Sequence, residues 1–229
     1  MPGLTLVIGN RNYSSWSLRP WIFMKHHGMT FEEKRILLST DTTADELGRY
    51  NSGLKVPVLL DGDRQIWDSL AILEYLSERY LDNRGWPANI AARALARSVS
   101  AEMHSSFPNL RNELPMNCRK SFDAIELSEQ ASREVERISS LWRMCRDRYA
   151  DNGDWLFGEF SIADAMYIPV ALRFAGYHIS LDDTSQRYVD TVLSDPGVIA
   201  WTDASRQETE IIAEDEIGMT ANATPPGGG

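Results

Sequence analysis

Cysteine is scarce in this chain of 229 residues, which holds only Cys118 and Cys145. The two form no CxxC motif and have no spacing typical of a zinc site. The sequence therefore excludes a disulfide-rich scaffold and gives no reason to expect a metal. Two isolated cysteines are typical of a protein kept in a reducing compartment, although the sequence does not exclude a disulfide between them.

Long apolar runs are also missing. No stretch approaches the roughly 18 apolar residues that a membrane span requires. The opening residues, MPGLTLVIGN, lack a basic region and hold too short an apolar stretch for a signal peptide. We therefore expect a cytoplasmic location and no membrane partner.

Basic residues are outnumbered, with 23 Lys and Arg against 33 Asp and Glu and a net charge of −10. This balance argues against nucleic acid and anionic membrane surfaces as partners. It leaves room for a small anionic ligand, because the free N–H groups of a helix N-terminus can hold one locally. Hydrophobic residues make up 43% of the chain, enough to bury a sizeable core in one large domain or two small ones.

Strand and helix signals alternate up to Leu81. The apolar run LTLVIG, residues 4–9, predicts a buried strand, and residues 17–27 predict a short helix. The rest of this half contains three more predicted strands and two more helices, which gives the order βαβαββα and a small mixed sheet. These segments are strands over 31–38, 56–62 and 64–67, and helices over 43–50 and 68–80.

Strand signals disappear after a short segment that contains Gly85 and Pro87. We therefore predict an α/β domain over residues 1–81, a linker over 82–86 and an all-α domain over 87–218. Residues 219–229 lack periodicity and are predicted to be disordered. The expected helices cover 90–114 with a kink at Pro108, 123–150, 161–176 with a Ser161/Asp164 capping box, 184–193 and 198–208.

Three short motifs in the first half carry the candidate chemistry. NRNYSSWSLRPW places serines between the first strand and its helix. In KVPVLL, Pro57 is expected to be trans, because only about 5–6% of X–Pro bonds in folded proteins are cis. At that proline, Val56 can present its backbone N–H and C=O to an extended peptide.

The third motif is WDSLAI, at the start of the helix predicted over 68–80. Either Asp68 or Ser69 can cap this helix, which alone explains both residues. Alternatively, the Ser69 hydroxyl and the free helix N–H groups bind a ligand carboxylate, and Asp68 takes a ligand ammonium group.

These motifs, in a βαβαββα domain followed by helices, resemble the glutathione transferase family, and most closely its serine-type zeta-like and bacterial members. The resemblance extends to about Gly218 and implies a thioredoxin-like first domain, a homodimer and glutathione as co-substrate, without a metal. It implies that the γ-Glu-Cys-Gly peptide pairs with Val56 beside Pro57. It also implies that Ser69 holds its γ-glutamyl carboxylate, Asp68 its ammonium group and Lys55 its glycyl end.

The resemblance further implies that a serine hydroxyl donates to the glutathione thiolate. Ser14 is the first candidate, Ser15 the second, and Ser17 is expected to cap the helix. Lowering a thiol pKa by about 2 units requires about 2.7 kcal/mol. A hydroxyl donated to a charged acceptor supplies roughly 1.5–3 kcal/mol, and a helix N-terminus adds about 0.3–1 kcal/mol. One serine and one helix terminus are therefore sufficient.

The reaction implied is transfer of this thiolate to a small hydrophobic electrophile. Trp16, next to the two serines, is assigned by the resemblance to the glutathione site. We also expect it to line the electrophile pocket between the two domains, together with Met103, His104, Phe107 and Asn109. Zeta-type maleylacetoacetate isomerases carry cysteine where Trp16 stands, which ranks a glutathione-dependent isomerase below conjugation. An isomerase or a peroxidase stays an alternative, and so does a non-enzymatic protein-interaction module with this fold.

Overall fold

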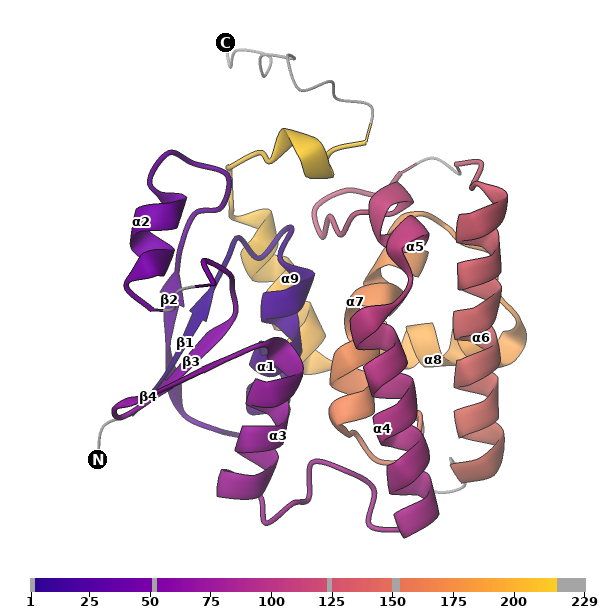
Figure 1. Cartoon of the computed structure of the whole chain (residues 1–229). Coiled ribbons are helices and arrows are strands. Elements are labelled where there is room, and N and C mark those ends of the chain that lie inside the picture. Colours follow the sequence, from indigo (N-terminus) through magenta and orange to yellow (C-terminus); the bar gives the residue numbers. More distant parts are fainter. Residues whose placement is uncertain (1–2, 51–52, 123–124, 150–152, 218–229) are drawn as a thin grey trace.

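The computed structural model describes residues 3–50, 53–122, 125–149 and 153–217 (Figure 1). The N-terminal half has the predicted order βαβαββα, followed by helices. Its strands are β1 (Leu4–Ile8), β2 (Phe31–Arg35), β3 (Val58–Asp61) and β4 (Arg64–Trp67), and its helices are α1 (Ser15–His26), α2 (Thr43–Gly48) and α3 (Ser69–Tyr80).

The four strands form one mixed sheet in the order β2-β1-β3-β4. β1 is parallel to β2 and antiparallel to β3, and β3 is antiparallel to β4. The tight turn between β3 and β4 passes through Gly62 at φ +59°, a conformation that glycine adopts without steric cost. The predicted small mixed sheet is confirmed.

Side chains of β1 alternate between two cores, because successive residues of a strand point to opposite faces. Leu6 and Ile8 belong to the large core that also includes α1 and α3. Val7 lies on the other face, in a smaller core with Ile36 and Leu47. The sheet is therefore covered on both faces, with α2 on the outer face and α1 and α3 on the face toward the helical half (Figure 1).

The helical half begins with α4 (Ile90–Ser105) and α5 (Pro108–Glu113). The helix predicted over 90–114 is therefore broken rather than kinked. Phe107 lies between the two pieces in the left-handed region at φ +66°. The break has a local cause, because proline disfavours the helical conformation of the residue before it and fits the first position of a new helix.

The remaining helices are α6 (Glu129–Tyr149), α7 (Ile162–Gly176), α8 (Asp183–Ser194) and α9 (Pro196–Arg206), with the short 3₁₀ turn η1 (Ala213–Asp215). The helix predicted over 123–150 begins only at Glu129, and residues 123, 124 and 150 lie outside the described ranges. The tail predicted to be disordered, 219–229, also lies outside them. Within the described ranges, no helix is long and apolar enough to cross a membrane.

Helix α7 is almost entirely buried and packs against α1, α4 and α8. The predicted capping box at its start is confirmed. The Ser161 N–H donates to Asp164 Oδ2 over 2.8 Å, and the Leu156 N–H donates to Asp164 Oδ1 over 2.9 Å. Burial raises the pKa of the Asp164 carboxyl to about 6. This carboxylate therefore fixes the N-terminus of the helix that connects the two halves.

Candidate functional site

The first turn of α1 begins earlier than its sequence suggests. Ser14 is the N-cap, and its Oγ accepts the Ser17 N–H over 3.4 Å. Ser17 therefore lies inside the helix, where its hydroxyl accepts the Gly9 N–H over 3.1 Å and ties α1 to the end of β1. The prediction that Ser17 caps the helix is wrong, because the helix already begins at Ser15 and its N-cap is Ser14.

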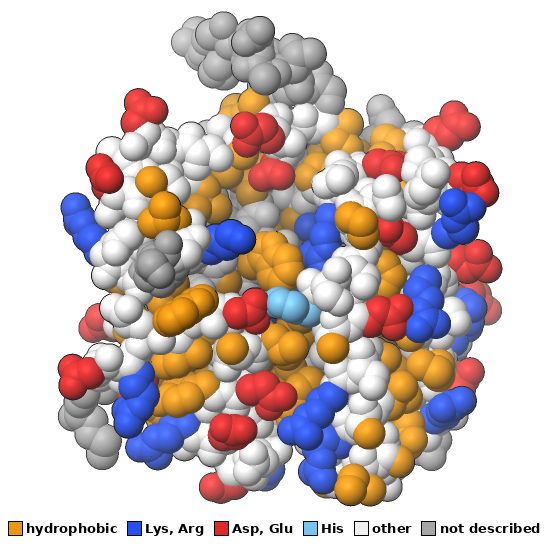
Figure 2. All heavy atoms as spheres, in the orientation of Figure 1, with side chains coloured by type: hydrophobic (Ala, Val, Ile, Leu, Met, Phe, Trp, Pro, Cys, Tyr) orange, Lys and Arg blue, Asp and Glu red, His pale blue; other side chains and the backbone are white. Residues whose placement is uncertain are grey.

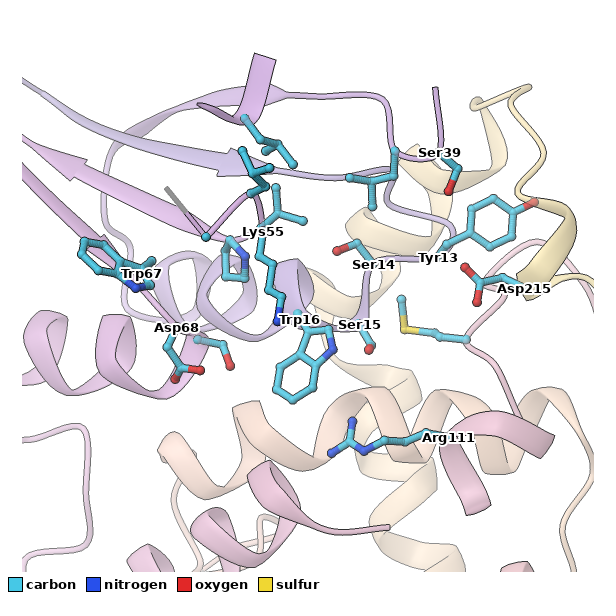
Figure 3. A pocket seen from close by; sticks show the side chains of 18 of the residues that line it. Tyr13, Ser14, Ser15, Trp16, Ser39, Lys55, Trp67, Asp68, Arg111 and Asp215 are labelled. Carbon is cyan, nitrogen blue, oxygen red and sulfur yellow. The ribbon is translucent and has the colours of Figure 1, made fainter. Parts of the chain in front are cut away.

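A cavity of about 940 Å³ opens between the sheet half and the helical half (Figure 3). All eight residues predicted to hold glutathione lie in its wall. They are Ser14, Ser15, Trp16, Lys55, Val56, Pro57, Asp68 and Ser69. On the face shown in Figure 2, hydrophobic side chains gather at the centre and basic side chains lie on both sides of them.

The Val56–Pro57 peptide bond is cis, so the expectation of a trans bond is wrong. Strand β3 begins directly after it, at Val58. Among the described residues, the backbone N–H and C=O of Val56 take part in no hydrogen bond. A polar edge is therefore open in the cavity wall at the position where an extended peptide can pair.

The N-terminus of α3 separates the two roles that the sequence left open for Asp68 and Ser69. Asp68 is the N-cap, and its Oδ1 accepts the Leu70 N–H over 2.9 Å. Its other oxygen, Oδ2, lies 3.1 Å from Nε2 of His104. The Ser69 hydroxyl is buried and has no hydrogen-bond partner within the described structure. It is therefore available to a ligand in the cavity.

Ser15 has a partner that comes from the helical half. Arg173 of α7 donates from its terminal nitrogen to Ser15 Oγ over 3.4 Å. Arg173 is only 6% exposed, and burial lowers the pKa of its guanidinium to about 10. It still carries its charge at neutral pH. Because Ser15 Oγ accepts from Arg173, the hydroxyl hydrogen of Ser15 can point toward the cavity.

The segment after α9 returns to the N-terminal half and holds the loop before α1. Glu208 accepts the N–H groups of Arg11 and Asn12 over 3.0 and 3.1 Å. The Tyr13 hydroxyl donates to Glu216 over 2.6 Å. Burial, reinforced by Glu216, raises the pKa of the Tyr13 hydroxyl. This tyrosine therefore holds the loop in place and is poorly suited to activating a thiol.

The residues expected to line the electrophile pocket separate into two groups. Trp16 and His104 lie in the cavity wall. Met103 and Phe107 are instead buried in the large core. The Asn109 amide donates to Glu134 over 2.7 Å and also lies outside the wall.

Several wall residues of the helical half were missed by the sequence analysis. They are Arg111, Pro115, Met116, Arg173 and Asp215. One of them had a signal, since Arg173 is the lone basic residue of the stretch IADAMYIPVALRFAG, in which Asp164 is the only other charged residue. The two cysteines offer no alternative nucleophile, because burial raises the pKa of each thiol to about 12.

Two separate regions of the sequence match models of one protein family. Residues 13–79 match the model of the glutathione S-transferase N-terminal domain, and residues 128–204 match that of the C-terminal domain. The chain belongs to the glutathione transferase family.

Similar proteins carry several functional names. The chain is 26% identical over 194 residues to a probable maleylacetoacetate isomerase of Caenorhabditis elegans, covering 83% of this chain and 88% of that protein. It is 28% identical over 164 residues to human glutathione S-transferase theta-1, covering 68% of each. A dichloromethane dehalogenase of Methylophilus leisingeri is 39% identical over 66 residues, or 28% of this chain and only 25% of that protein.

Solved structures show the same fold. A glutathione transferase homologue from Burkholderia, crystallised with bound glutathione, superposes with a TM-score of 0.68 at 24% identity, covering 90% of this chain and all of that one. Ure2p in complex with S-hexylglutathione superposes with a TM-score of 0.65 at 21% identity, covering 87% and 98% of the two chains.

Proposed function

We propose that this protein is an enzyme that binds glutathione and transfers its thiolate to a small electrophile. The observation that carries this proposal is the composition of one cavity wall. Two serine hydroxyls at the start of α1, the open backbone of Val56 and the unpartnered hydroxyl of Ser69 face the same space. These groups suit the three functional parts of a γ-Glu-Cys-Gly peptide.

In this proposal the peptide runs along the sheet side of the cavity. Its cysteinyl backbone pairs with Val56, and its γ-glutamyl carboxylate meets Ser69 and the N-terminus of α3. Asp68 takes the ammonium group through Oδ2, the oxygen that faces His104 in the unliganded protein. Lys55 also lies in the wall and is assigned to the glycyl carboxylate.

The thiol then lies beside Ser14 and Ser15. Ser14 remains the first candidate for the activating hydroxyl, because it sits at the N-cap where the helix end is most positive. In this structure the Ser14 O–H donates to Ser17 Oγ over 2.7 Å, so the proposed activation requires the O–H to rotate toward the thiolate. The Ser15 hydroxyl, held by Arg173, is the second candidate.

A glutathione-dependent isomerase is the second candidate function. It is favoured by the alignment with the probable maleylacetoacetate isomerase, which covers 83% of this chain. Isomerisation also uses glutathione as a nucleophile and needs the same serine. Trp16 lines the cavity at the position where the zeta-type isomerases carry cysteine, and this difference favours conjugation over isomerisation.

Isothermal titration of glutathione, with turnover of 1-chloro-2,4-dinitrobenzene and of maleylacetone, tests this proposal. Conjugation predicts binding and turnover of the halide, whereas faster turnover of maleylacetone identifies the isomerase. Failure to bind glutathione, with no turnover of either substrate, contradicts both and favours an interaction module. Homodimer formation stays a prediction that sedimentation measurements test.

A further inference from the structure

Three arginines gather beside Trp16 on the helical side of the cavity. The Arg19 guanidinium lies 4.2 Å from the centre of the Trp16 ring, and the Arg111 guanidinium lies 4.9 Å from it. Figure 3 shows Arg111 reaching from α5 across the cavity toward Trp16. Arg173 completes the group from α7, with its contact to Ser15.

None of these three guanidinium groups forms an ion pair within the described part of the chain. Arg111 donates to the backbone carbonyls of Met103 and Ser106. Arg173 donates to two further carbonyls and to Ser15. All three nitrogens of the fully buried Arg19 lack a hydrogen-bond partner among the residues that the structure describes.

Such an arrangement is costly without an anion. Removing a charged group from water costs several kcal/mol unless an opposite charge or a hydrogen-bond network compensates for it. Repulsion between the guanidinium groups adds to this cost. The pKa of Arg19 is lowered by burial and, in addition, by the positive charges of Arg111 and Arg173. The cluster is therefore poised to accept a negative charge.

The acidic residues of the wall supply only part of that charge. Asp68 favours the charged form of Arg19, and Asp215 that of Arg173, but neither forms an ion pair with an arginine within the described part of the chain. Asp68 pairs with His104 instead. In the proposed binding mode the γ-glutamyl carboxylate of glutathione occupies the N-terminus of α3, on the opposite wall. The glycyl carboxylate is assigned to Lys55, so the anion that meets the arginines is either the glutathione thiolate or a group of another molecule.

We propose that the electrophile of this enzyme carries a carboxylate or a comparable anionic group, which Arg111 and Arg173 bind while Arg19 adds positive potential from behind Trp16. The proposal rests on the proposed glutathione transfer, for which it names the second substrate. The apolar body of the electrophile packs against Trp16, Pro115 and Met116, which lie in the same wall. Arginine suits this role because its planar fork matches a carboxylate.

A binding experiment tests the proposal independently of catalysis. An unreactive matched pair, 3,5-dinitrobenzoate and 1,3-dinitrobenzene, is titrated calorimetrically into the full-length protein with and without S-methylglutathione. We expect the carboxylate to bind at least tenfold more tightly than the neutral compound. Equal affinity for the two overturns the proposal, whether or not glutathione binds. Failure of S-methylglutathione to bind counts only against the proposed transfer.

Arg111→Gln is the decisive variant, because Arg111 is less deeply buried than Arg173 and its loss threatens folding less. The preference for the carboxylate should fall to threefold or less in Arg111→Gln and be partly kept in Arg111→Lys. Arg133→Gln makes the same charge change at an exposed position of α6 and should keep the full preference. An unchanged preference in Arg111→Gln overturns the proposal.

Kinetics separate this role from stabilisation of the glutathione thiolate by the same arginines. In Arg111→Gln, kcat/KM should fall at least tenfold for 4-chloro-3,5-dinitrobenzoate and less than threefold for 1-chloro-2,4-dinitrobenzene. A raised pKa of the bound thiol, with equal losses on both substrates, means that the arginines serve the thiolate and overturns the proposal.

Discussion

The carboxylate of Asp68 lies 3.1 Å from Nε2 of His104, and this contact joins the N-terminus of α3 to α4 across the mouth of the cavity. The same carboxylate caps α3 through its other oxygen. Asp68 thus has a structural role through Oδ1, while Oδ2 contacts His104 in the cavity wall, where we propose that a ligand ammonium group binds. These two roles can be separated by substitution.

Asp68→Asn should weaken glutathione binding by about 10- to 100-fold, because a hydrogen bond to a charged group is worth about 1.5–3 kcal/mol. Asparagine keeps the cap and tolerates the φ of +72° found at this position, so the melting temperature should barely change. Calorimetric titration of both proteins measures the difference. Equal affinity for glutathione would show that Asp68 only caps the helix.

Ser69→Ala should weaken glutathione binding by a similar factor and leave the free energy of unfolding unchanged or up to about 1 kcal/mol higher. The gain in stability is expected because the substitution removes a buried hydroxyl that has no partner. Ser77→Ala on the same helix is the matched control. Ser77 Oγ accepts the Gly85 N–H over 3.0 Å, so this variant should lose stability and keep its affinity for glutathione. Normal binding by Ser69→Ala would rule out a ligand role.

Asp164→Ala should lower the free energy of unfolding by about 2–5 kcal/mol, because the Leu156 and Ser161 N–H groups lose their acceptors in the core. KM for glutathione should stay the same. Because burial raises the folded-state pKa of Asp164 to about 6, the pH-dependent part of its contribution to stability is complete below about pH 4 and is lost as the pH rises through 6, while the hydrogen bonds to the N–H groups remain.

The loss caused by Asp164→Ala should therefore be about 3 kcal/mol larger at pH 4 than at pH 7.5. Urea unfolding of both proteins at the two pH values measures this difference. A loss that is independent of pH would contradict the raised pKa. A large change in KM with normal stability would contradict the structural role.

Local signals were sufficient for the first half of the fold and for the side of the cavity that Ser14, Val56 and Ser69 line. The apolar run of β1, the Asp61–Gly62 turn and the amphipathic pattern of α3 each act within a few residues along the chain. The motifs around Ser14, Val56 and Ser69 lie at the ends of these elements, so placing the elements also placed the motifs.

The features that were missed depend on contacts between distant segments. The segment after α9 contacts the loop before α1 through Glu208 and Glu216, which are ordinary acidic residues in the sequence. Arg111 and Arg173 come from different helices and meet only after α5 and α7 have packed. The break at Phe107 and the early start of α1 are local, but each moves a helix boundary by only a few residues.

Titration of the thiolate absorbance of bound glutathione tests the central claim most directly. In the wild-type protein the pKa of the bound thiol should lie about 2 units below its free value near 8.5. Ser14→Ala should raise it by at least 1 unit, Ser15→Ala by less, and Ser14→Thr, which keeps both the hydroxyl and the cap, should leave it near the wild-type value. If neither alanine variant raises the thiol pKa, activation by a serine hydroxyl at the start of α1 is wrong.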